Sequence, residues 1–160
     1  MVVSHFISKA IPCFHILVWP IWGVLKEERN SIKMDQEQVE MVGRMFVDRY
    51  YQLFDNDRAS VSLFYQPSSM LNFEGQKILG VDNISSKLNQ LPFEKCRHDI
   101  STVDSQPSST STGSIVVFVS GSLQLVGEEH SLRFNQMFHL VPFGQESFFV
   151  QNDIFRLNYG

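Results

Sequence analysis

The apolar residues change their spacing part-way along the chain, and this change limits the fold more than any other feature. From residue 39 to 53 they recur every three or four positions, which places them on one stripe of a helix. From residue 115 to 140 they alternate, as in strands with one buried face. The helical positions are Val39, Val42, Phe46, Tyr50 and Leu53; the strand positions are Ile115, Val117, Val119, Leu123, Leu125, Leu132, Phe134, Phe138 and Leu140. Helices followed by strands predict an α+β domain, with helices packed on one face of a curved antiparallel sheet.

Capping residues and prolines set the expected helix ends. Asp35 with Gln38 three residues on is typical of a capping box, so the first helix should start there and end at 55–57. Two shorter helices are expected: Arg58–Tyr65, capped by Asp57 and stopped by Pro67, and Asp82–Leu91, ended by Pro92.

Turn residues divide the rest of the chain into strands. Met70–Phe73 and Gln76–Leu79 flank Glu74-Gly75 and predict a tight hairpin, with Gly75 supplying the positive φ. Further strands are expected over Arg97–Val103, Ser114–Val126, the alternating stretch from Leu132, and Phe148–Leu157; Gly127–His130 is a turn and Ser105–Gly113 a flexible surface loop.

Both faces of this sheet carry apolar residues. Val116, Phe118 and Val126 alternate with the first apolar set of their strand. The helices cover one face only, so a second copy of the chain could cover the other, and a symmetric dimer is our hypothesis.

The first 33 residues differ from the rest. Ile11–Leu25 is strongly apolar, but roughly 15 residues fall short of the ~20 that cross a bilayer as a helix. Pro12 and Pro20 also fit a signal peptide poorly, and Met34 could itself serve as an initiator. We expect residues 1–33 to be a poorly ordered extension without membrane insertion, and 34–160 to be one domain.

Composition favours a protein partner over a nucleic acid. The net charge of −4 provides no basic field for phosphate, whereas it suits a basic protein surface. Fourteen phenylalanines must line a crowded core or a cavity. Cys13 and Cys96 are interpreted as free thiols.

No catalytic, cofactor or metal motif is visible in the sequence. A G-x-S-x-G elbow and phosphate-binding glycine loops are absent. Cys96 and His98 lack an orienting acid nearby in sequence, and His98, His130 and His139 lack metal-ligand spacing. Glu74, Glu128 and Glu129 lie on turns beside apolar strands, either as solvated residues or as an acidic rim for a basic partner.

Five segments together resemble the nuclear transport factor 2 family, in its order and spacing. They are Tyr50–Arg58, Phe73–Gln76, Leu91–Phe93, Gln136–Phe138 and Asn152–Leu157. The match covers Met34 to Gly160, and the ending Leu157–Gly160 and the turn Gly127–His130 look most like the plant members. Animal members have Trp where this chain has Phe73 and Val39.

This resemblance implies a cone-shaped homodimer that carries the small GTPase Ran in its GDP form into the nucleus and touches Phe-Gly repeats of pore proteins. It implies no enzyme activity or cofactor, and a location in cytoplasm and nucleus, enriched at the nuclear envelope and pore. By the family pattern, the wall of the apolar pocket consists of Phe73, Leu91, Phe93, Cys96, Leu132 and Phe155. The acids at its rim are Glu74, Glu128 and Glu129, and Lys95 is a basic contact. The residues at the dimer interface are Phe118, Met137 and Ile154.

Two other interpretations stay open at this point. The same cone fold houses small isomerases and dehydratases, which would need a buried carboxylate with a raised pKa; the candidates are Asp99, Asp104 and Asp153, the last better read as structural. A scaffold domain of the kind attached to RNA-binding or export factors would normally come with further domains.

Overall fold

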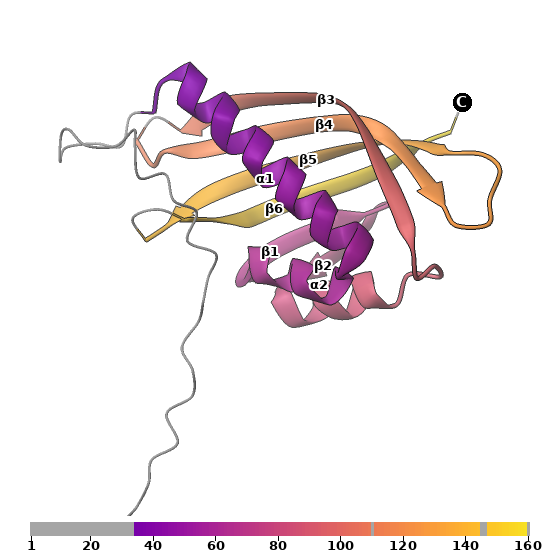
Figure 1. Cartoon of the computed structure of the whole chain (residues 1–160). Coiled ribbons are helices and arrows are strands. Elements are labelled where there is room, and N and C mark those ends of the chain that lie inside the picture. The colour runs from indigo at the N-terminus through magenta and orange to yellow at the C-terminus, as the bar shows by residue number, and fades with distance from the viewer. Residues whose placement is uncertain (1–33, 110, 145–146, 160) are drawn as a thin grey trace, which may run out of the picture.

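Two α-helices, one 3-10 helix and six strands make up the part of the chain that the computed structural model describes, residues 34–109, 111–144 and 147–159 (Figure 1). They are α1 (Gln36–Asn56), η1 (Arg58–Phe64), β1 (Tyr65–Phe73), β2 (Gln76–Leu79), α2 (Val81–Asn89), β3 (Cys96–Ser109), β4 (Ser114–Leu125), β5 (Leu132–Phe143) and β6 (Ser147–Asn158). The predicted extension, residues 1–33 with Ile11–Leu25, lies outside these ranges. Within them, no helix is long and apolar enough to cross a membrane.

The first helix begins where its capping residues predict. The Asp35 carboxylate accepts from the Gln38 backbone N–H at 2.8 Å, and the Gln38 side chain accepts from the Asp35 N–H at 3.0 Å, which satisfies two N-terminal donors. The predicted apolar stripe is buried along the whole helix. The helix ends at Asn56, and the Asp57 N–H donates to the Leu53 carbonyl.

The next segment corrects the prediction that Pro67 stops a helix. Residues 58–64 form a 3-10 helix, and β1 begins at Tyr65, so Pro67 lies inside a strand. The pairing of β1 with β6 shifts register between Tyr65 and Met70, which accommodates a residue without an N–H. The 3-10 helix η1 therefore ends where β1 begins to pair with β6. The helix α2 is shorter than predicted and ends at Asn89.

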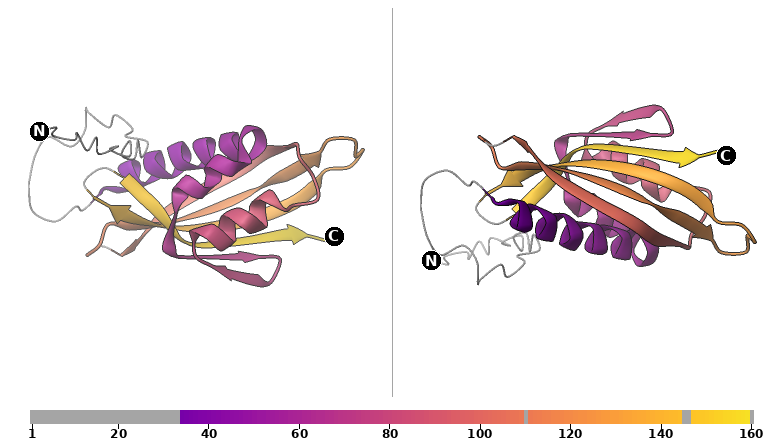
Figure 2. Two further views of the ribbon diagram at one scale, coloured as in Figure 1. Left: turned by 90° about the horizontal axis from the view of Figure 1, so that it is seen from below. Right: turned by 90° about the horizontal axis from the view of Figure 1, so that it is seen from above.

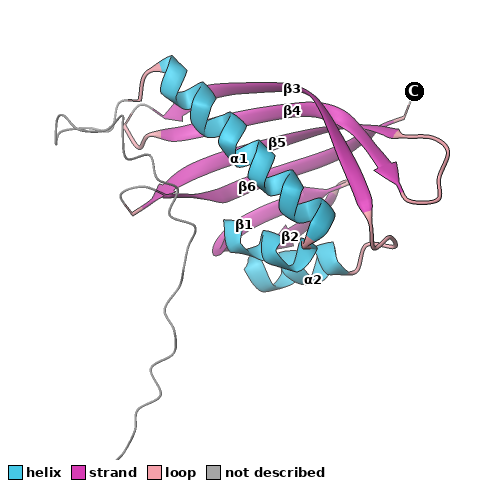
Figure 3. Cartoon of the chain, in the orientation of Figure 1, coloured by secondary structure: helices cyan, strands magenta, loops and turns pink. Residues whose placement is uncertain are grey.

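The six strands form one curved sheet in the order β2-β1-β6-β5-β4-β3 (Figure 3). The β1–β6 pair is parallel, which corrects the prediction of a wholly antiparallel sheet. All other pairs are antiparallel, and the hairpin register Phe73 to Gln76 agrees with the predicted turn. After β1 and β2 the chain continues to β3 at the far edge of the sheet and returns through β4 and β5. The last strand, β6, therefore lies inside the sheet, between β5 and β1.

The third strand is longer than predicted. It runs to Ser109 and pairs with β4 up to Ser114, so the expected surface loop over 105–113 is wrong for Ser105 to Ser109. Ser105 is buried because α1 crosses directly above it. A Cβ added at Gly43 of α1 would lie 1.9 Å from the Ser105 Oγ, so only glycine permits this approach.

The core lies between the concave face of the sheet and α1, which crosses it diagonally (Figures 1 and 2). Aromatic rings dominate its centre: Tyr50 and Phe46 of α1 pack on Phe138 of β5, with ring centroids 4.7 and 4.9 Å apart. The abundance of phenylalanine therefore reflects a crowded core. Both α-helices lie on this side of the sheet, so within the described residues no helix covers the convex face.

Candidate functional site

The β1–β2 turn fixes a carboxylate at the end of β6. Both central residues have positive φ, 51° at Glu74 and 88° at Gly75, so Gly75 plays its predicted part and Glu74 shares the strained backbone. Glu74 is held by two bonds to β6. Its N–H donates to the Phe155 carbonyl at 3.1 Å, and its Oε1 accepts from the Leu157 N–H at 2.6 Å.

Aromatic rings form a row from this turn across the concave face. Phe73 stacks on Phe155 with centroids 4.8 Å apart and planes 6° apart, and Phe155 stacks on Phe134 at 5.6 Å. Phe134 in turn meets the His98 ring edge-on at 5.3 Å. The Lys87 ammonium of α2 lies 5.6 Å from the Phe73 ring centroid. The row joins β1, β6, β5 and β3 into one apolar wall.

Arg58 holds the segment between α2 and β3. Its guanidinium donates to the carbonyls of Phe93 at 2.8 Å and Glu94 at 3.1 Å, and lies 4.7 Å from the Phe93 ring centroid. Leu91 and Phe93 are half-buried and pack against the core. Lys95 is exposed, and its carbonyl accepts from the Val126 N–H.

Cys96, His98 and Asp55 form a cluster where α1 ends against the start of β3. Asp55 accepts from the Cys96 thiol at 3.3 Å, from the His98 N–H at 2.9 Å and makes a 2.6 Å contact with His98 Nδ1. Burial would raise the pKa of Asp55, but the His98 hydrogen bonds outweigh it and the pKa is lowered. Burial, then Asp55, raises the pKa of the Cys96 thiol to about 12, so the thiol stays protonated.

The acidic turn after β4 lies beside Cys96. Cys96 pairs with Leu125, and residues 126–129 follow at once. Glu128 and Glu129 are exposed, and the Glu128 carbonyl accepts from Gln124. In the described ranges neither carboxylate forms an ion pair. Leu132, at the start of β5, is 38% exposed.

The structure brings some of the predicted site residues into two contact groups. Phe73, Glu74 and Phe155 are in direct contact, while Phe93 and Cys96 are joined through Arg58. The Glu128–Glu129 turn is connected to Cys96 by strand register alone. Sequence reasoning missed Arg58 and Asp55 as parts of this wall, although both lie in the quoted segment 50–58.

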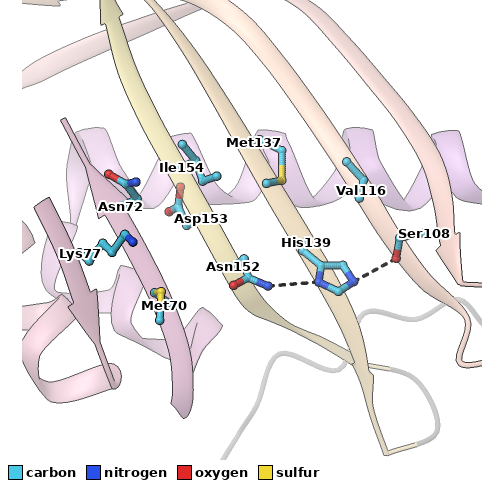
Figure 4. A pocket seen from close by; sticks show the side chains of 10 residues that line it. All are labelled: Met70, Asn72, Lys77, Ser108, Val116, Met137, His139, Asn152, Asp153 and Ile154. Carbon is cyan, nitrogen blue, oxygen red and sulfur yellow. Dashed lines mark hydrogen bonds between the residues drawn. The ribbon is translucent and has the colours of Figure 1, made fainter. Parts of the chain in front are cut away.

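The convex face carries the three residues assigned to a dimer interface. Phe118, Met137 and Ile154 face one another across β4, β5 and β6, and Phe118 and Ile154 are 42% and 39% exposed. A hollow of about 380 Å³ beside them is lined by Met70, Val116 and Met137, with polar groups at its margin (Figure 4). There the His139 ring bonds Ser108 Oγ at 2.9 Å and Asn152 Nδ2 at 3.3 Å.

Asp153 has the raised pKa that an acid–base enzyme of this fold would need. It is 1% exposed, and burial raises its pKa to about 6 against the lowering effect of its hydrogen bonds. Its oxygens accept from Tyr65 at 2.6 Å, Gln136 at 2.8 Å and Tyr50 at 3.4 Å. The carboxyl is thus enclosed by core side chains and anchors α1 and the start of β1 to β6. Asp104 is exposed, and Asp99 pairs with Arg97 at the surface.

Residues 42–157 match the profile described as the Nuclear transport factor 2 (NTF2) domain. The chain belongs to the nuclear transport factor 2 family. It is 57% identical over 126 residues to "Nuclear transport factor 2B" of Arabidopsis thaliana, a match that covers 79% of this chain and 99% of the relative. The rice protein "Nuclear transport factor 2" is 53% identical, over 76% of this chain and 98% of its own.

Solved structures agree with membership of the nuclear transport factor 2 family. The family member from Cryptosporidium parvum superposes with a TM-score of 0.71 at 37% identity, covering 76% of this chain and 95% of that one. A chain from the Candida albicans Mtr2-Mex67 M domain complex has a TM-score of 0.60 at 17% identity, over 72% and 93% of the two chains. The second likeness shows the fold alone.

Proposed function

We propose that this chain is a nuclear import carrier for the small GTPase Ran in its GDP form. One observation carries the proposal: the Glu74 carboxylate is fixed by β6 beside the stacked Phe73–Phe155 pair, in a chain 57% identical to a protein named for nuclear transport. An acid held next to half-buried Phe73 suits a partner that offers an aromatic side chain flanked by basic residues.

The pocket wall that we propose is the one assigned by the family pattern. It consists of Phe73, Leu91, Phe93, Cys96, Leu132 and Phe155, with Glu74, Glu128 and Glu129 as acids and Lys95 as a basic contact. Burial of one aromatic ring contributes about 1.5–3 kcal/mol, and half-shielded charge pairs around it select basic neighbours. Switch II of a GTPase changes arrangement with the γ-phosphate, so such a pocket accepts one nucleotide state.

The same proposal includes a homodimer and contact with Phe-Gly repeats of nuclear pore proteins. The row of Phe118, Met137 and Ile154, which no other described residue covers, supports a second copy on the convex face, because a large exposed apolar patch is unusual on a monomer. The carrier would then work in the cytoplasm and nucleus and concentrate at the nuclear envelope and pore.

The test is capture of purified Ran, loaded with GDP or GTP, by the wild-type chain and by Glu74→Lys. We expect capture of the GDP form only, and its loss in Glu74→Lys, because the reversed charge repels the basic groups of the partner. Asp48→Lys, the same charge change at an exposed position of α1, is the matched control and should bind normally. Equal capture of both nucleotide forms, or capture by Glu74→Lys, would count against the pocket.

A further inference from the structure

Three different metal-binding groups converge where α1 meets the start of β3. The carboxylate of Asp55, the thiol of Cys96 and the imidazole of His98 each offer one ligand atom, and these atoms all lie within 4.8 Å of one another. We propose that this cluster binds a thiophilic divalent ion of the zinc class through one sulfur, one nitrogen and one oxygen. The proposal does not depend on the carrier function.

The protons of the cluster show how an ion would be accommodated. Asp55 Oδ1 receives the Cys96 S–H at 3.3 Å and faces His98 Nδ1 at 2.6 Å, so one oxygen is the centre of both contacts. A divalent ion bound between Asp55 Oδ1, the Cys96 sulfur and His98 Nδ1 replaces these two contacts. The thiol releases its proton to solvent and binds as thiolate, while the neutral imidazole carries its proton on Nε2 and binds through Nδ1. Ion, thiolate and carboxylate together are neutral, which limits the cost of burying them.

Binding of an ion requires the ligand atoms to move by up to roughly 1 Å. Bonds of about 2.0–2.1 Å to oxygen and nitrogen in tetrahedral geometry separate the two atoms by about 3.3 Å, so the 2.6 Å contact must widen by roughly 0.7 Å. We expect rotation of the Asp55 side chain, which is 16% exposed, to supply most of this widening, because the His98 ring is packed against aromatic neighbours. The His98 backbone N–H donates to Asp55 Oδ2 at 2.9 Å and orients the carboxylate, as outer-shell partners do in metal sites. Asp55 is 16% exposed and Cys96 8%, which gives the ion a route from solvent and a fourth ligand from water.

Arg58 determines which ions the cluster accepts. Its Nη2 lies 3.9 Å from the Cys96 sulfur, where a positive charge favours the thiolate and opposes the cation. Hard ions such as Mg²⁺ and Ca²⁺ gain little from sulfur and cannot overcome that repulsion. Zn²⁺, Cd²⁺ and Co²⁺ form strong bonds to thiolate, so we expect the cluster to discriminate in their favour.

The experiment is an anaerobic titration of the full chain, first freed of metal by a chelator, with Co²⁺. Tetrahedral thiolate coordination produces a near-ultraviolet charge-transfer band and intense visible bands. We expect these bands to saturate at one ion per chain, to disappear on addition of Zn²⁺ and to be unaffected by excess Mg²⁺. Cys96→Ser should abolish the charge-transfer band and weaken binding by more than the roughly 10–100-fold typical of losing an outer-shell partner.

Cys13→Ser is the matched control, because Cys13 is the other thiol of the chain. It should keep the bands, whereas His98→Gln should shift them. Circular dichroism confirms that each variant is folded, and Zn²⁺ should raise the Tm of the wild type but not of Cys96→Ser. Absence of the bands in the wild type, or their loss in Cys13→Ser with retention in Cys96→Ser, would overturn the proposal.

Discussion

At the scale of single residues, the pKa and the hydrogen bonds of a buried polar group depend on residues that are distant in the sequence. Asp153 lies in a six-residue segment of known family pattern, yet its pKa is raised because the fold removes it from water. Tyr50, Tyr65 and Gln136 come from three other elements and complete its hydrogen bonds. An isolated buried carboxyl would be far more costly than this satisfied one.

Asp153 makes the stability of the fold depend on pH. Its folded pKa of about 6 lies above the ordinary value of 3.8, so the folded state holds the proton more tightly than the unfolded state. The resulting stabilisation is complete below about pH 4 and is lost as pH rises to about 6; a shift of this size corresponds to on the order of 3 kcal/mol.

Urea unfolding of Asp153→Asn and wild type between pH 4 and pH 7 measures this effect. The unfolding free energy of the wild type should fall relative to that of Asp153→Asn as pH rises over that range, since Asn does not titrate. Exposed Asp104→Asn should follow the wild type. A constant difference for Asp153→Asn would show that the carboxyl does not hold the proton.

At the scale of elements, the contact between α1 and β3 decides how tightly the core closes. Gly43 lets the helix backbone approach Ser105, and Gln36 at the start of α1 donates to the Ser105 carbonyl at 3.0 Å. The serine-rich composition of residues 105–113 predicts a loop, but helix packing and pairing with β4 make its first half a strand.

Gly43→Ala should therefore destabilise the protein. At an ordinary helix position this change stabilises by about 1 kcal/mol, but here the new Cβ meets Ser105 Oγ at 1.9 Å and Cβ at 2.9 Å. We expect a net loss of about 1–3 kcal/mol, as for overpacked cores. Chemical unfolding checks the sign, and the double variant with Ser105→Gly should recover most of the loss. Stabilisation by the single variant would contradict the close approach.

At the scale of the whole molecule, the two faces of the sheet differ in what covers them. α1 and the core occupy the concave side, whereas the convex side exposes an apolar row and a hollow. An isologous dimer would bury the row against its copy and would leave the half-buried Phe73 on the other side accessible to a partner.

Met137→Glu should convert the proposed dimer to a monomer, because Met137 is the central residue of the row between Phe118 and Ile154. A buried unpaired carboxylate in each copy opposes association. Sedimentation at micromolar concentration measures the mass, and it should halve. Exposed Arg133→Glu, four residues earlier on the same strand, should remain dimeric. A wild type that is already monomeric would reject the dimer.

Local patterns predicted the elements, and the distant pairings came only from the folded chain. The capping box at Asp35, the period of α1, the Glu74-Gly75 hairpin and the alternation in β4 and β5 each depend on neighbours a few residues away, so they can be read along the sequence.

Family resemblance added the pocket residues, of which Phe73 and Phe155 do stack. The parallel β1–β6 pair, the packing of α1 on Ser105 and the convergence of Asp55 with Cys96 and His98 depend on residues about 40 or more positions apart. Spacing rules for metal ligands miss that last cluster because Asp55 comes from another element, and only tertiary packing brings it within bonding distance.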